Sequence, residues 1–218
     1  MIEVTYVDHM GSDLSVVNAA RVSFGKKSDW MMRVHNGEAK VLSQKDSKLI
    51  TYLAKHKHYS PFNHTFVTFH VKAPIFVARQ LQKHEYMIWN EISRRYVDDD
   101  PEFYFPLTWR GRSADKKQGS DGEVKSNFNI NYHTMTALKG YQQMLDEGVS
   151  PEQARMVLPQ SMMTEWYWSG TMKAMHKMCS LRCKSDTQLE TQIVANYIDE
   201  EMAKLFPVSW EALRAYED

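Results

Sequence analysis

The residues best suited to chemistry are concentrated between positions 79 and 96. On a helix that begins near Pro74, Gln80, Lys83 and His84 fall at i, i+3 and i+4, so they share one face. The segment that follows adds amide, carboxylate, hydroxyl and guanidinium groups, at Asn90, Glu91, Ser93, Arg94 and Arg95. Guanidinium groups bind phosphate oxygens in pairs, and amides can read the imide edge of a pyrimidine. The segment therefore predicts a phosphate and pyrimidine site, although composition alone slightly favours a solvated helix end.

The elements around this segment are predicted to be a turn, a strand and a helix. Residues 58–62 form the turn, and residues 65–72 then alternate between apolar and polar side chains with the period of a strand. Pro74 is suited to the first position of a helix, which we expect to end near His84. Nearer the start of the chain, residues 2–6 alternate like a strand and residues 41–56 have helical spacing.

The second half of the chain is predicted to be mostly helical. Residues 132–145 have helical spacing, and Ser150 and Ser185 are each followed three positions later by glutamine, as in a capping box. The second signature precedes a long helix, whose apolar face is predicted to carry Leu189, Ile193, Tyr197 and Leu205. Residues 166–168, two tryptophans around a tyrosine, are assigned to helix packing.

Residues 108–127 contain few large apolar side chains and three glycines, so we expect a mobile surface loop. Such a loop could close over a substrate. If it is a lid, deletion of its glycine-rich middle should raise the Michaelis constant for a substrate.

Composition limits the class of protein. The chain has 218 residues, of which 43% are hydrophobic and 25% charged, and its formal net charge is zero. These values predict one globular domain over residues 1–218, without wholesale attraction to nucleic acid. There is no apolar run of membrane-spanning length, so no membrane partner is expected, and two cysteines suit a reducing cytoplasm. The expected fold class is α/β (mixed α+β), with a central sheet flanked by helices and a helical carboxy-terminal half.

Two other groups of residues invite a metal hypothesis. His176, Cys179 and Cys183 lie at i, i+3 and i+7, but on a helix the outer two are about 10 Å apart along the axis, and a second pair of ligands is lacking. Packing near the site is the favoured explanation. The acidic run at 98–100 is better explained as a solvated loop before Pro101. We therefore predict no metal site.

The motif pattern resembles that of the flavin-dependent thymidylate synthase family. The family motif is Arg-His-Arg, four residues, Asn-Glu, one residue, Ser, one residue, Arg-Tyr. The matching positions here are Lys83, His84, Glu85, Asn90, Glu91, Ser93, Arg95 and Tyr96. Segments 20–23, 69–74, 78–80, 154–159 and 180–182, together with Asp186, are also similar to the family. The resemblance is scattered over most of the chain at compatible spacing.

The resemblance implies a set of binding residues. The positions that would hold deoxyuridylate (dUMP) are Gln80, Leu81, Gln82, Lys83, Glu91, Ile92, Ser93, Arg94, Arg95, Arg155 and Arg182. The positions that would line FAD are His58, Ser60, Lys83, His84, Glu85, Asn90, Glu91, Thr171, Lys173 and Lys177. Arg182 would lie against the pyrimidine and polarise it, so it is the expected catalytic residue. The family usually has Asn, Arg and Asn at the last three FAD positions.

The resemblance also implies a reaction and an assembly. Methylenetetrahydrofolate would supply one carbon, NADPH would reduce FAD, and the uracil ring would be methylated without an enzyme nucleophile. The implied assembly is a homotetramer whose active sites are shared between chains, with the last three FAD positions supplied by a neighbouring subunit.

Departures from the family motif leave alternatives open. Lysine at position 83 keeps the positive charge of arginine but loses its planar fork, and Glu85 reverses a charge near the flavin. A related enzyme with another C5-modified product, such as hydroxymethyl-dUMP, is therefore an alternative, as is a non-catalytic nucleotide- or flavin-binding relative. The retained Arg155 and Arg182 and the neutral net charge argue against the non-catalytic relative.

Overall fold

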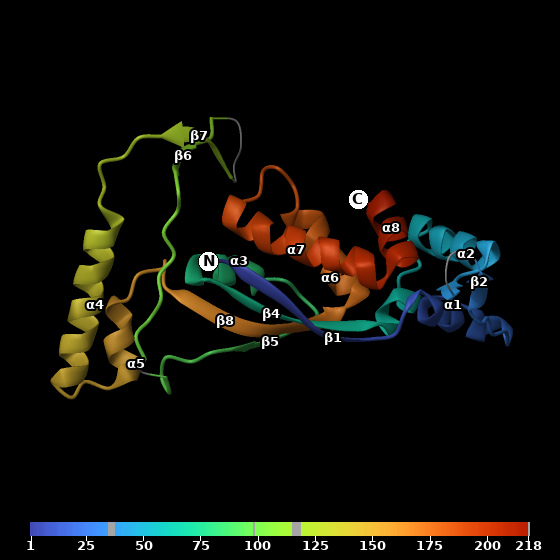
Figure 1. The fold of residues 1–218 in the computed structure, drawn as a ribbon, viewed down its shortest axis with the longest axis horizontal. Coiled ribbons are helices and arrows are strands. Elements are labelled where there is room, and N and C mark those ends of the chain that lie inside the picture. Colours follow the sequence, from blue (N-terminus) through green and yellow to red (C-terminus); the bar gives the residue numbers. More distant parts are fainter. Residues whose placement is uncertain (35–37, 98, 115–118, 218) are drawn as a thin grey trace.

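The computed structural model describes residues 1–34, 38–97, 99–114 and 119–217. Its centre is a four-stranded antiparallel sheet in the order β1-β4-β8-β5 (Figure 1). The four strands are β1 (Glu3–Met10), β4 (Phe66–Pro74), β5 (Met87–Glu91) and β8 (Met163–Thr171). Two small hairpins join β2 (Met31–Val34) to β3 (Glu38–Val41) and β6 (Trp109–Arg112) to β7 (Ser120–Val124).

Helices cover one face of this sheet and extend the molecule at both ends. In Figure 1, α3 (Ile75–Leu81), α6 (Met172–Arg182) and α7 (Leu189–Leu205) lie over the sheet. At one end are α1 (Asp13–Arg21), α2 (Gln44–Lys55) and α8 (Pro207–Ala215), and at the other are α4 (Ile130–Asp146) and α5 (Pro151–Ala154). Three 3₁₀ turns occur at Val22–Phe24, Ser60–His64 and Arg155–Val157. The expected mixed α/β class, with a central sheet and helices, is confirmed.

Side-chain alternation explains which sheet face is buried. Along β4, Val67, Phe69 and Val71 are fully buried, whereas the polar residues between them are only partly buried. On the paired strand β8, Trp166 and Trp168 are buried on the helix side, and Tyr167 between them is 52% exposed. This alternation is the strand period, so the assignment of residues 166–168 to a helix is wrong.

The helix α3 is shorter than predicted and ends at Leu81. Pro74 is its N-cap rather than its first residue, and Gln82 is its C-cap. The amide of His84 still donates to the carbonyl of Leu81 at 3.1 Å, but Tyr86 has a φ of 64°, which turns the chain into β5. Lys83 and His84 therefore lie in the turn between α3 and β5. Periodicity did not predict β5, which is an edge strand of the sheet.

Three predictions for the second half need correction. Residues 109–112 and 120–124 pair as a hairpin, and Arg110 joins β6 to a buried glutamate of α7, so the mobile-loop prediction is wrong for those residues. Residues 115–118 lie outside the described part. Ser150 is the N-cap of α5 but makes no side-chain cap bond, and α7 begins after Gln188 rather than near Ser185. The predicted face of α7 is also displaced, since Leu189 and Tyr197 are exposed.

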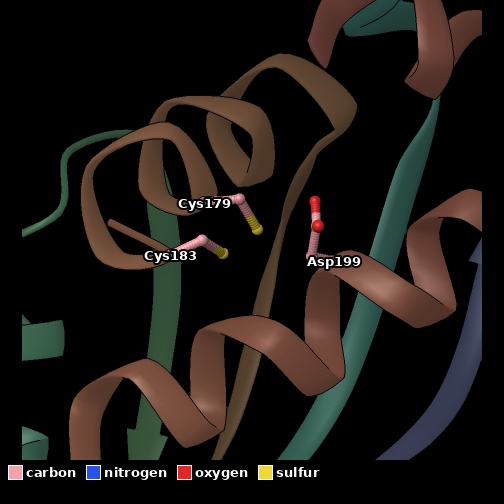
Figure 2. A group of neighbouring side chains, drawn as sticks. All are labelled: Cys179, Cys183 and Asp199. Atoms are coloured by element: carbon pink, nitrogen blue, oxygen red, sulfur yellow. The ribbon is translucent and has the colours of Figure 1, made fainter. Parts of the chain in front are cut away.

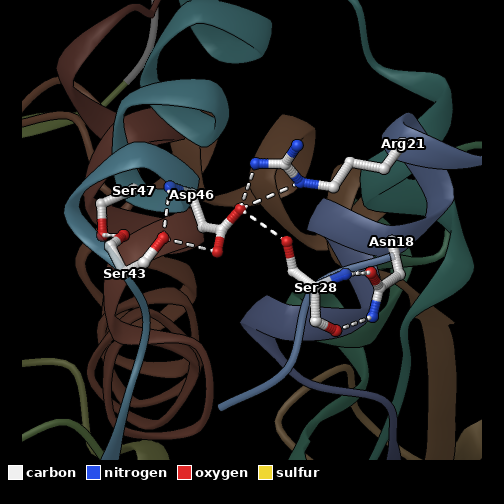
Figure 3. Close-up of polar contacts among 6 residues, drawn as sticks. All are labelled: Asn18, Arg21, Ser28, Ser43, Asp46 and Ser47. Atoms are coloured by element: carbon white, nitrogen blue, oxygen red, sulfur yellow. Dashed lines mark hydrogen bonds and ion pairs between the residues drawn. The ribbon is translucent and has the colours of Figure 1, made fainter. Parts of the chain in front are cut away.

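A buried ion pair joins the first two helices. Arg21 donates to Oδ1 of Asp46 at 2.5 Å, and Ser28 and Ser43 also donate to this carboxylate (Figure 3). Burial alone would raise the pKa of Asp46, but the hydrogen bonds from Ser43, Arg21 and Ser28 lower it. Arg21, from the segment at 20–23, thus fixes α1 against the start of α2.

Candidate functional site

A cleft of about 430 Å³ lies where α3, the end of α6 and the start of α7 meet. Its lining is rich in cations and amides: Arg79, Gln80, Lys83, Arg182 and Gln188, with Gly119 from the hairpin. No carboxylate is among the described residues that line it. Its size falls in the ordinary range for small-ligand sites, and its lining suits an anion that carries a hydrogen-bonding ring.

Arg182 is the last residue of α6 and is held by two acceptors. Its Nε donates to Nε2 of His84 at 3.0 Å, and its Nη2 donates to the backbone carbonyl of Gln80 at 3.4 Å. Burial lowers the pKa of Arg182, but a guanidinium in a protein stays protonated. The side chain is therefore a partly buried cation with a fixed orientation, and it lines the cleft.

His84 is a neutral acceptor in this arrangement. Burial, followed by the charges of Arg182 and Lys177, lowers its pKa from 6.5 to about 4. Because Nε2 accepts from Arg182, the ring proton must be on Nδ1. The ring also lies beside Trp168 of β8, with centroids 6.4 Å apart. Packing against the sheet thus keeps the histidine uncharged, which allows it to orient a cation.

A chain of hydrogen bonds fixes the amide of Gln80. Its Nε2 donates to Oε1 of Gln188, and its Oε1 accepts from the Thr191 hydroxyl at 3.1 Å. Gln188 donates in turn to Glu190 at 3.1 Å, and Glu190 accepts two bonds from Nη2 of Arg110, at 2.7 and 2.8 Å. Burial alone would raise the pKa of Glu190, but the bonds and charge of Arg110 lower it. We call Arg110, Glu190, Gln188 and Gln80 the Glu190 network.

The β6–β7 hairpin lies close to this cleft. Gly119 has a φ of 85°, and a Cβ atom there would lie 2.6 Å from the carbonyl oxygen of Asp186. Only glycine fits so near to another backbone in that conformation. A second cavity of about 380 Å³, lined partly by Phe76, Tyr104 and Trp109, also includes Gly119 and Gln188 in its wall. Gly119 and Gln188 therefore border both cavities.

The remaining residues expected to bind dUMP lie outside this cleft. Leu81 is fully buried in the core, and Gln82 accepts a bond from Arg79 at 3.0 Å. Glu91 ends β5 and accepts from Thr164 at 2.7 Å, and the amide of Ile92 donates to the carbonyl of Glu165.

The three arginines of the predicted dUMP set that follow β5 contact groups outside the cleft. Arg94 forms an ion pair with Asp99 at 2.8 Å, Arg95 lies over the ring of Tyr96, and Ser93 accepts from the amide of Arg95 at 3.4 Å. Arg155 is exposed, and its Nε donates to the carbonyl of Glu152 at 3.3 Å. Of the predicted set, Gln80, Lys83 and Arg182 line this cleft, whereas Ile92 and Arg94 line a separate small cavity beside Asp99 and Glu102.

The residues expected to line FAD form two groups. Near the start of α6, Thr171 donates to Asn63 at 2.8 Å and Lys173 lies 3.5 Å from the centre of the Tyr59 ring. The first group also includes His58 and Ser60, which are exposed at the start of the 3₁₀ turn Ser60–His64. In the second group, Lys177 and Glu85 form an exposed ion pair of 2.9 Å.

The second group flanks the Arg182–His84 contact. Lys177 lowers the pKa of His84 in addition to pairing with Glu85. Asn90 is exposed on the edge strand, opposite Tyr167 in the ladder. The chain thus presents hydroxyl, ammonium and imidazole groups on two surfaces rather than in one closed pocket.

Several residues that shape the cleft were not predicted. The sequence pattern places Gln188 in a capping box, and nothing in the pattern marks Arg110 or Glu190 as site residues. Glu190 and Thr191 are buried in α7. Two adjacent polar residues on the buried side of a helix usually have specific hydrogen-bond partners, and this is the feature that could have pointed to the site. The contacts of Gln188, Arg110 and Glu190 span up to 108 positions of sequence, so local periodicity gives no information about them.

Comparisons with known proteins identify the family. The family model described as thymidylate synthase complementing protein matches residues 5–208. Flavin-dependent thymidylate synthase from Thermus thermophilus is 36% identical over 216 residues, which cover 98% of this chain and 76% of that protein. The enzyme of the same name from Kosmotoga olearia is 38% identical over 215 residues, covering 96% and 88%. The chain therefore belongs to the thymidylate synthase complementing protein family, which confirms the resemblance.

Solved structures agree with this assignment. The crystal structure of the UMP/dUMP methylase PolB from Streptomyces cacaoi with 5-Br dUMP matches with a TM-score of 0.83 and 32% identity. The match covers 99% of this chain and 96% of that one. The same methylase with 5-Br UMP matches with a TM-score of 0.78 and 31% identity, covering 99% and 95%. In the described part of this chain, no helix is sufficiently long and apolar to span a membrane.

Proposed function

We propose that this protein is a flavin-dependent thymidylate synthase that methylates dUMP at C5 to give dTMP. The observation that carries the proposal is the oriented guanidinium of Arg182 in a cleft lined by cations and amides, in a chain of this family. Arg79 and Lys83 supply charge for a phosphate, and the amides of Gln80 and Gln188 supply donors and acceptors for a base.

Arg182 is proposed to stabilise negative charge on the pyrimidine as C5 reacts. Its orientation is set before the substrate binds, because His84 and the carbonyl of Gln80 already hold two of its nitrogen atoms. Preorganised charge of this kind is worth more in a water-poor site than in bulk solvent. Neutral His84 serves as a positioning residue, since a protonated imidazole would repel the guanidinium.

The polar groups on the two FAD surfaces fit an anionic dinucleotide. Ammonium groups of Lys83, Lys173 and Lys177 and hydroxyls of Ser60 and Thr171 are the donor types that diphosphate and ribose groups need. The charge of Glu85 does not oppose this fit, because Lys177 neutralises it at 2.9 Å. When bound, FAD would supply the hydride chemistry, with NADPH as reductant and methylenetetrahydrofolate as carbon donor.

We further propose that the active site is completed by other copies of the chain in a homotetramer. Support comes from the separation of Glu91–Arg95 and Arg155 from the Arg182 cleft within one chain. The edge strand β5 and its flanks also expose apolar side chains, with Tyr86 82% and Ile88 62% exposed. Exposed apolar groups beside an unpaired strand edge are typical of association surfaces. Cross-linking or light scattering of the purified protein would test the assembly.

Acceptance of UMP is a second candidate activity. It is favoured by the match to the structure titled UMP/dUMP methylase, which was solved with both bromo-nucleotides. To test both activities, dUMP or UMP deuterated at C5 would be supplied with FAD, NADPH and methylenetetrahydrofolate. Methylation at C5 must release the label, so label loss that requires Arg182 and survives the surface change Lys204→Gln supports the proposal. Label retained with both nucleotides would refute it.

A further inference from the structure

We propose that Cys179, Cys183 and Asp199 form a binding site for a thiophilic divalent cation of the zinc class. The two cysteines lie on the last turns of α6, and Asp199 faces them from α7 (Figure 2). One ligand atom from each residue lies within 4.8 Å of the other two. Such a cation would join two helices that meet beside the Arg182 cleft, but the site is separate from the proposed function.

Helix geometry favours a metal over a disulfide at this pair. Cys179 and Cys183 are four residues apart, so their Cβ atoms on a helix are separated by about 5–6 Å. A disulfide requires a Cβ separation of about 3.5–4.5 Å, which would distort the last turn. A cation bound through two bonds of about 2.3 Å to sulfur spans the wider gap without that distortion. The spacing is therefore suited to chelation.

Asp199 is already oriented as a third ligand. The indole Nε1 of Trp210 and the Nε of Arg214 both donate to its Oδ1, at 2.9 and 3.0 Å. Ligating carboxylates in metal sites commonly accept such outer hydrogen bonds, which fix their direction. Because α8 supplies both donors and α7 supplies the carboxylate, the third ligand is held from two helices.

The charges also fit a divalent cation. Two thiolates and one carboxylate carry three negative charges, and the Arg214 guanidinium, which also pairs with Glu217, offsets only part of them. A divalent cation would neutralise two of these charges, which matters because Cys179 is fully buried. Three protein ligands leave a fourth coordination position open. The Cys179 thiol donates to the carbonyl of Ala195 at 3.8 Å, so binding of the cation would release this proton.

The structure changes the ligand set that the sequence suggested. His176 was the third residue of that set, but its Nε2 bonds to the carbonyl of Leu213 at 3.0 Å and it is not part of the group. Asp199 takes its place from a different helix, which spacing within α6 could not reveal. The expectation of no metal rests on the axial separation of His176 and Cys183 and on the lack of further ligands; Asp199 replaces His176 and removes the first objection.

The test uses Co²⁺, because its thiolate complexes absorb in the near ultraviolet and its tetrahedral complexes absorb in the visible. The full chain would be reduced with a phosphine, freed of metal with a chelator that is then removed, and titrated. We expect thiolate charge-transfer absorption that saturates at one Co²⁺ per chain and is displaced by Zn²⁺. We also expect Zn²⁺ to raise Tm. Absence of the thiolate band with both thiols reduced would overturn the proposal.

Variants identify the ligands. Cys183→Ser, at a partly exposed position, should abolish the charge-transfer band and the rise in Tm. Asp199→Asn should weaken Co²⁺ binding by about 10-fold or more while the thiolate band remains at saturation. His56→Gln is the control for adventitious surface binding and should change neither result. Unaltered affinity in Asp199→Asn would exclude the three-ligand site, even if Cys183→Ser failed to fold.

Discussion

The Nε atom of Arg182 donates to Nε2 of His84 over 3.0 Å, although the two residues are 98 positions apart in the chain. The contact joins the end of α6 to the turn after α3. It depends on a histidine that packing keeps neutral, with a pKa of about 4. A fixed cation at the wall of a cation-lined cleft is the feature on which the proposed chemistry depends.

Replacement of Arg182 by lysine should impair catalysis more than binding. Lysine keeps the charge but loses the planar group that contacts His84 and the Gln80 carbonyl together. We expect kcat to fall by about 100-fold or more, as when a preorganised donor is lost, with a smaller change in the nucleotide KM. Steady-state kinetics measure both. An unchanged kcat would remove Arg182 from the chemistry.

The pKa of His84 predicts a specific loss of stability in acid. The unfolded chain takes up a proton near pH 6.5, whereas the folded chain does so only near pH 4. The free energy of unfolding should therefore decrease as the pH falls from 6.5 towards 4, and His84 should contribute no slope above 6.5. Urea unfolding of the wild type and of His84→Asn across this range isolates the effect. Parallel pH profiles for the two proteins would show that His84 is not held neutral.

Glu190 is predicted to orient the two glutamines of the nucleotide cleft through the Glu190 network. Glu190→Gln keeps the shape but leaves Arg110 without its charged acceptor, so Gln188 and Gln80 lose their fixed orientation. We expect the nucleotide KM to rise about 10-fold, equivalent to about 1.4 kcal/mol, with little change in kcat.

The matched control is Glu123→Gln, which removes an exposed carboxylate from the same hairpin. It should leave KM unchanged. In a double-mutant cycle, Arg110→Met should add little to Glu190→Gln, because both changes break one contact. Fully additive effects would show that the hairpin does not act through Glu190.

Glu85 and Lys177 should have opposite effects on FAD. Glu85→Gln frees the charge of Lys177, so FAD should bind about two- to fivefold more tightly, the range expected for an exposed ion pair. Lys177→Met leaves Glu85 unpaired and should weaken FAD binding, while the double variant should lie near wild type. Fluorescence titration of FAD gives the three affinities. Shifts of the same sign in both single variants would place the pair away from the flavin.

Periodicity predicted the elements that bury a regular face. Strand β4 alternates cleanly, and α4 was located to within two residues of its start. Strand β8 was missed although Trp166 and Trp168 alternate with Tyr167, because large aromatic side chains are equally common in helical cores. Strand β5 could not be anticipated, since its stability depends on pairing with a strand about 80 residues away.

The candidate site was predictable only in part. The motif located Gln80, Lys83 and Arg182, and the structure brings these three to one cleft. Their mutual orientation depends on Gln188, Glu190 and Arg110, which are joined through long-range hydrogen bonds that leave no periodic trace. The pairing of Glu85 with Lys177 is of the same kind. It turns an apparent charge reversal into a neutral pair.

The most direct test of the account is the mass of the nucleotide product. The purified protein would be incubated anaerobically with FAD, NADPH, methylenetetrahydrofolate and dUMP, and the quenched nucleotide would be analysed by mass spectrometry. We expect the increment of one methyl group at C5, formed at least about 100-fold more slowly when Arg182 is replaced by lysine. A hydroxymethyl increment, or unchanged dUMP with flavin still bound to the protein, would contradict it.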